Sequence, residues 1–125
     1  MNRVPTVLIA DDEMIVARTL ARAFHRVGIS SLIETHAREV VDRAEAAQPE
    51  FIVLDIRQEV DGRDVLAALK RNPRTARIPV YMLSSCDDQF VRRTCLELGA
   101  EDYDTKPFDC LYVEHVLRRL RAHGH

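Results

Sequence analysis

The chain has 125 residues, a formal net charge of −2 at pH 7, 46 % hydrophobic residues and 30 % charged residues. This size and composition are typical of one globular domain over residues 1–125, and they exclude a disordered, collagen-like or coiled-coil chain. The charge gives no support for direct nucleic-acid binding, and the absence of a long apolar stretch or signal-peptide pattern gives none for a membrane protein, so we expect a cytoplasmic location.

Apolar runs alternate along the chain with segments of helical periodicity, which is the pattern of βαβ units in a parallel sheet. Strands are predicted near residues 6–10, 31–35, 51–55, 79–83 and 101–104. Helices are predicted over residues 14–27, 38–47, 62–71, 88–98 and 110–122. Gly28 and Gly99 follow the first and fourth helices, as expected of residues that end a helix in a left-handed conformation. The sequence therefore predicts a doubly wound α/β fold with five strands and five helices.

Two of the predicted strands, FIVLD at 51–55 and the run VYMLSS from residue 80, are continuously apolar up to their last residues. Strands that alternate apolar and polar residues have one solvent-exposed face, whereas continuously apolar strands are covered by helices on both faces. These two segments are therefore predicted to be interior strands of the sheet.

Polar side chains of complementary chemistry stand at the ends of the predicted strands. They are Asp11, Asp12, Asp55, Ser84 and Lys106. Because parallel strands joined by right-handed crossovers end at one edge of the sheet, we expect these side chains to meet there. Crowded carboxylates raise one another's pKa unless a hard cation lies among them, which points to Mg²⁺ and a phosphoryl site. The alternative for any single Asp is a helix cap or turn residue.

The segments VLIADDE, IVLD, PVYMLSS and GAEDYDTKPF occur in this order. Together they resemble the receiver domain of two-component response regulators over essentially the whole chain. The resemblance implies a flavodoxin-like, five-stranded parallel sheet of strand order 2-1-3-4-5 with five helices. It also implies that Asp55 takes a phosphoryl group from the phosphohistidine of a histidine kinase or phosphotransfer protein.

The same resemblance implies roles for the other residues. Asp11, Asp12, Asp55 and the main-chain carbonyl of Arg57 would bind Mg²⁺. Lys106 and Ser84 would contact phosphoryl oxygens, while Ser84 and Tyr103 would form a conformational switch. The alternative for Tyr103 is a half-buried strand residue. Such a protein is not a conventional enzyme, since it catalyses only its own aspartyl phosphorylation and dephosphorylation.

The loop after Asp55 departs from the family pattern. Receiver domains commonly have a proline four residues after the phosphoacceptor and a glycine eight residues after it, whereas this chain has Glu59 and, one residue early, Gly62. The shorter loop affects the placement of the Arg57 carbonyl, and so the affinity for Mg²⁺. The Arg57 side chain either holds the phosphoryl group or is a solvated loop arginine.

Two functions of different classes follow from these observations. The first is a phosphoacceptor that switches a surface on the fourth helix, fifth strand and fifth helix, for a homodimer or a downstream protein. That surface is expected to carry Arg92, Arg93, Tyr103, Tyr112, Glu114, Arg118 and Arg119. The alternative is a phosphorylation-independent pseudo-receiver that binds a partner constitutively. The five histidines have no metal-ligand spacing and are interpreted as surface residues.

Overall fold

The computed structural model describes residues 4–55, 61–85, 87–106 and 111–122 of the chain. Five parallel strands form one sheet: β1 (Thr6–Ala10), β2 (Ser30–Glu34), β3 (Phe51–Asp55), β4 (Val80–Ser84) and β5 (Asp102–Thr105). Their order across the sheet is β2-β1-β3-β4-β5, which confirms the predicted topology. The strand order reverses between β1 and β3, and ligand sites of open α/β sheets form at such a point.

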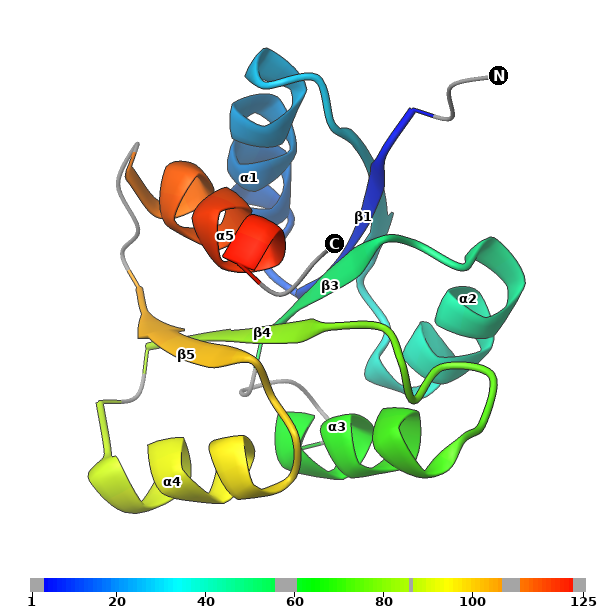
Figure 1. Cartoon of the computed structure of the whole chain (residues 1–125), viewed down its shortest axis with the longest axis vertical. Coiled ribbons are helices and arrows are strands. Elements are labelled where there is room, and N and C mark those ends of the chain that lie inside the picture. Colours follow the sequence, from blue (N-terminus) through cyan, green and yellow to red (C-terminus); the bar gives the residue numbers. More distant parts are fainter. Residues whose placement is uncertain (1–3, 56–60, 86, 107–110, 123–125) are drawn as a thin grey trace.

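Helices cover both faces of the sheet (Figure 1). They are α1 (Met14–Arg26), α2 (Val40–Ala47), α3 (Gly62–Arg71), α4 (Gln89–Glu97) and α5 (Leu111–Ala122), and a short 3₁₀ helix at Ala37–Glu39 precedes α2. One hydrophobic core lies between the sheet and α2, α3 and α4, and a second lies between the sheet and α1 and α5. Successive strand residues alternate between the two cores, so that Leu8 packs in the first and Ile9 in the second.

The two strands predicted to be interior occupy interior places in the sheet. All residues of β3 and β4 are buried, including their polar last residues, Asp55 and Ser84. The apolar runs are thus explained by helices on both faces, and each run places one polar side chain at the edge where it ends.

Helix ends follow from local chemistry. The Asp61 and Asp88 side chains accept hydrogen bonds from backbone N–H groups in the first turns of α3 and α4, which satisfies donors that have no partner within the helix. Gly28 has a φ of 85° and Gly99 a φ of 108°, as predicted for residues that end helices. In the described part of the chain, no helix has the length and apolar character needed to cross a bilayer.

Gly28→Ala is expected to lower the free energy of unfolding by about 1 kcal/mol, because a Cβ disfavours positive φ. Nothing lies within 4 Å of the position that the added Cβ would take, so the loss measures backbone strain alone. Urea unfolding followed by circular dichroism measures it. Gly28→Asn should lose less, since Asn tolerates this conformation better; equal stability of the Ala variant and the wild type would contradict the explanation.

Candidate functional site

The carboxyl edge of the sheet brings together the side chains predicted to meet there. Asp11 follows β1, Asp55 ends β3, Ser84 ends β4, and Lys106 follows β5. Asp11 and Asp55 are each 2 % exposed and Ser84 is fully buried, whereas Asp12 is exposed. The buried polar groups therefore lie at the sheet edge, with Asp12 on the solvent side.

Lys106 is the cation that approaches these carboxylates. Its Nζ lies 2.9 Å from Asp11 Oδ2 and 3.6 Å from Asp55 Oδ1, and its side chain is 10 % exposed. The backbone N–H of Lys106 donates a 2.6 Å hydrogen bond to the Ser84 carbonyl oxygen. This bond continues the β4–β5 ladder past Thr105, so the sheet fixes the backbone position from which the Lys106 side chain extends.

Burial raises the pKa of Asp11, and the hydrogen bonds it accepts from the Glu13 backbone N–H and from Lys106 offset this only in part. Burial by itself lowers the pKa of Lys106, but its contacts with Asp11, Asp55 and Glu13 outweigh burial and raise that pKa. The lysine therefore stays charged among acids whose negative charge is incompletely balanced.

The donor set fits a hard divalent cation. Asp11, Asp12, Glu13 and Asp55 each offer a carboxylate oxygen, and these oxygens all lie within 4.8 Å of one another. Oxygen-rich sites of this kind suit Mg²⁺. Burial is the main cause of the raised pKa of Asp11, and the charge of Glu13 adds to it, so a bound cation would stabilise the ionised carboxylate. The predicted fourth group, the Arg57 carbonyl, and Glu59 fall in residues 56–60, outside the described residues.

Glu13 was not singled out from the sequence, yet it joins this site. Its Oε1 accepts a 3.1 Å hydrogen bond from Lys106 Nζ. The only available signal was its place as the third of three consecutive acids at the end of the first strand.

Tyr103, predicted to be a switch residue, is 1 % exposed and packs in the core beneath α4. The Arg92 guanidinium lies 5.9 Å from its ring centre and donates a 2.9 Å hydrogen bond to its carbonyl oxygen. The ring therefore points inward in this conformation.

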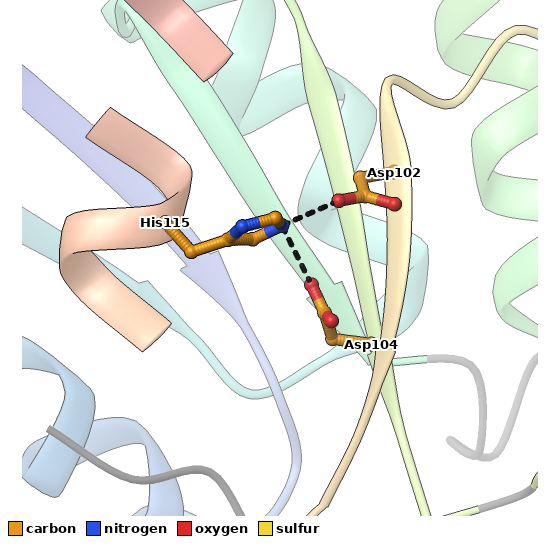
Figure 2. A group of neighbouring side chains, drawn as sticks. All are labelled: Asp102, Asp104 and His115. Carbon is orange, nitrogen blue, oxygen red and sulfur yellow. Dashed lines mark hydrogen bonds and ion pairs between the residues drawn. The ribbon is translucent and has the colours of Figure 1, made fainter. Parts of the chain in front are cut away.

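A second group of titratable side chains joins β5 to α5 (Figure 2). His115 Nε2 lies 2.7 Å from Asp102 Oδ2 and 3.8 Å from Asp104 Oδ2. Asp102 is oriented by its other oxygen, which accepts a hydrogen bond from the Tyr103 backbone N–H. The sequence interpretation of His115 as a surface residue was therefore incomplete, because the ring is half-buried and paired with acids of the neighbouring strand.

The predicted partner surface on α4, β5 and α5 is also smaller than expected. Tyr103 and Tyr112 are 1 % and 6 % exposed, so neither ring contributes to it. Arg119 donates a hydrogen bond to the Glu101 carbonyl oxygen and lies 3.5 Å from Asp102. The charged groups of the prediction remain at the surface: Arg92, Arg93, Glu114 and Arg118.

Comparison with known proteins identifies the class to which this fold and site belong. The sequence model of the response regulator receiver domain family matches residues 7–118 of the chain. The chain therefore belongs to the response regulator receiver domain family. A putative response regulator from Chloroflexus aurantiacus is similar in structure, with a TM-score of 0.87 and 26 % identity over 95 % of this chain and 99 % of that one.

Curated relatives of the chain are named as transcriptional regulators. The alkaline phosphatase synthesis transcriptional regulatory protein PhoP of Bacillus subtilis is 34 % identical over 118 residues, covering 90 % of this chain and 48 % of PhoP. The DNA-binding dual master transcriptional regulator RpaA of a Synechocystis strain is 34 % identical over 119 residues, covering 94 % of this chain and 48 % of RpaA. The chain thus spans about half the length of these relatives.

Asp104→Asn is expected to raise the free energy of unfolding near neutral pH. In the folded protein, burial and then the charge of Asp102 raise the pKa of Asp104 above 3.8, the usual value for an aspartic acid side chain. The nearby His115, Arg92 and Arg119 lower this pKa, but by less. Protonated Asp104 therefore stabilises the fold below pH 3.8, and this contribution is lost as the pH rises through the raised pKa.

Urea unfolding of the wild type and Asp104→Asn across this pH range tests the prediction. The gain should disappear below pH 3.8, where the aspartic acid is itself neutral in both states. Asp42→Asn, at an exposed position on α2, is the control for the loss of a carboxylate. A gain that persists unchanged at low pH would exclude this charge as its cause.

Proposed function

We propose that the chain is a phosphoacceptor switch. Asp55 takes a phosphoryl group from the phosphohistidine of a histidine kinase or phosphotransfer protein, and the change reaches a surface on α4, β5 and α5. The observation that carries the proposal is the position of the Lys106 ammonium group, 3.6 Å from Asp55 Oδ1 within the acidic cluster. Membership of the receiver family supports it.

In the proposed transfer, a carboxylate oxygen of Asp55 forms a bond to phosphorus. The bond from phosphorus to the donor nitrogen breaks, and its electron pair remains on the imidazole. Both reacting groups are negative, so their approach needs compensating positive charge. Lys106 supplies part of it with an ammonium group that its raised pKa keeps protonated.

Asp11, Asp12 and Asp55 are the residues that would hold Mg²⁺. When bound, Mg²⁺ would neutralise negative charge and align the phosphoryl group with the attacking oxygen. Ser84 ends the strand beside β3, in register one residue beyond the partner of Asp55, which is a suitable place for a hydroxyl that donates to a phosphoryl oxygen. The Arg57 carbonyl completes the proposed set as implied by family resemblance.

The route from the site to the partner surface runs along β5. Lys106 lies just beyond the carboxyl end of this strand, while Asp102 and Asp104 contact α5 through His115. A change in the partner of Lys106 at one end of this short strand can therefore alter the contacts of Asp102 and Asp104 with His115. A phosphoryl group would favour whichever of two conformations binds it more tightly. The partner is a downstream protein or a second copy of the chain. The cytoplasmic location stays a prediction.

The second candidate is a constitutive pseudo-receiver that binds its partner without phosphorylation. The short loop after Asp55, which lacks the family's proline, favours it. Mg²⁺-dependent labelling of Asp55 that changes partner affinity would exclude this candidate.

Acetyl phosphate is expected to add one phosphoryl group to the wild type only when Mg²⁺ is present, and none to Asp55→Asn. Intact-mass spectrometry measures the adduct. Asp42→Asn serves as the control for loss of a carboxylate and should be labelled like the wild type. If Asp55→Asn is labelled equally, the phosphoacceptor assignment is wrong. Absence of labelling from acetyl phosphate and kinases, with no Mg²⁺ affinity, would support the pseudo-receiver.

Phosphorylation is also expected to shift backbone amide resonances of α4, β5 and α5 more than those of α2. Two-dimensional ¹H–¹⁵N NMR before and after acetyl phosphate and Mg²⁺ are added measures the difference. The wild type with Mg²⁺ but without acetyl phosphate controls for Mg²⁺ binding alone. Shifts confined to residues beside Asp55 would show that the chain accepts a phosphoryl group without switching this surface.

A further inference from the structure

Helix α1 begins at a residue that is poorly suited to capping it. Glu13 occupies the N-cap position, where Ser, Thr, Asp and Asn are preferred because their short side chains accept hydrogen bonds from the first turn. The Glu13 side chain makes no such bond. It reaches instead to Lys106, 93 residues further along the chain, and accepts a hydrogen bond from Nζ. Residues that depart from the local preference for helix capping are expected mainly at functional sites.

The contacts of Lys106 show what this bond does. Its ammonium group has three protons to donate. Nζ lies 2.9 Å from Asp11, 3.1 Å from Glu13 and 3.6 Å from Asp55. The first two distances are hydrogen bonds, and the third is too long for one. Lys106 is thus held most closely by the two residues beside α1, and least closely by the proposed phosphoacceptor.

The position of Glu13 is itself fixed. Its backbone N–H donates a 2.9 Å hydrogen bond to Asp11 Oδ1, while the other oxygen of Asp11 contacts Lys106. Asp11, Glu13 and Lys106 therefore form a closed set of contacts in which the Glu13 carboxylate is the most exposed group, with 61 % of its side chain accessible. Of the two acids that bind Lys106 most closely, Glu13 is the one that can move away into solvent.

We propose that Glu13 is a positioning residue that holds Lys106 in a resting place and so slows phosphorylation of Asp55. The inference rests on the proposed function, in which Lys106 contacts a phosphoryl oxygen. In the proposed role, Lys106 loosens its hydrogen bond to Glu13 as it turns toward a phosphoryl group on Asp55. Because solvent screens an ion pair with so exposed a partner, releasing it should change the rate about two- to five-fold.

The rate constant for labelling by acetyl phosphate, at saturating Mg²⁺, tests this role in three variants. Glu13→Gln removes the charge with little change in shape. Glu13→Asp keeps the charge but shortens the side chain by one methylene group, which weakens the contact with Lys106. Asp42→Asn removes an exposed carboxylate from α2, outside the proposed switching surface, and is the control. Saturating Mg²⁺ separates the effect on Lys106 from any effect on metal affinity.

Both Glu13 variants are expected to be labelled about two- to five-fold faster than the wild type, while Asp42→Asn is unchanged. The difference between Glu13→Gln and the wild type should shrink at high ionic strength, which a purely structural effect would not do. Urea unfolding of each variant checks that the fold is retained.

The possible failures are distinguishable. A wild type that takes up no label contradicts the phosphoacceptor function itself. A labelled wild type with Glu13→Gln equally fast or slower overturns only the role of Glu13. If Glu13→Gln is faster but Glu13→Asp matches the wild type, charge near the donor explains the rate and the positioning role is wrong.

Discussion

The arrangement of the site depends on one ammonium group placed among buried carboxylates. Asp11 and Asp55 are almost fully buried, and burying a charge is costly unless it is paired. Burial raises the pKa of Asp11, and its hydrogen bonds with the Glu13 backbone and Lys106 offset this only in part. The proposed binding of Mg²⁺ and the proposed exchange of Lys106 partners both depend on this buried group of charges.

The fold makes that arrangement possible through the order of its strands. The three interior strands end in a polar residue or just before one. Lys106 follows the edge strand β5, and its backbone hydrogen bond to Ser84 holds it beside the end of β4. Helices cover both faces of β3 and β4, and the residues that precede Asp55 and Ser84 in these strands are apolar or aromatic and buried. The site is thus a consequence of where buried strands stop.

The sequence predicted the elements and much of the site because apolar strand runs, helix periodicity and polar residues at strand ends are local signals. All the strands and helices, and the meeting of Asp11, Asp55 and Lys106, follow from these signals, whereas the strand order was implied by the resemblance to receiver domains. The link from Glu13 to Lys106 and the pairing of His115 with Asp102 could not be predicted, because each depends on side-chain directions between distant elements. The inward packing of Tyr112 was missed for the same reason, and Tyr103 is buried more deeply than the half-buried strand position considered for it.

The charges along β5 also bear on how the molecule avoids aggregation. This strand lies at the edge of the sheet, where unpaired backbone groups can add a strand from another chain. Asp102 and Asp104, with His115 on α5 and Arg92 on α4, place charged and titratable groups beside that edge. A second strand could pair there only by displacing or desolvating them. The polar contacts that join α5 to the sheet therefore lie where they would also oppose the pairing of another chain with β5.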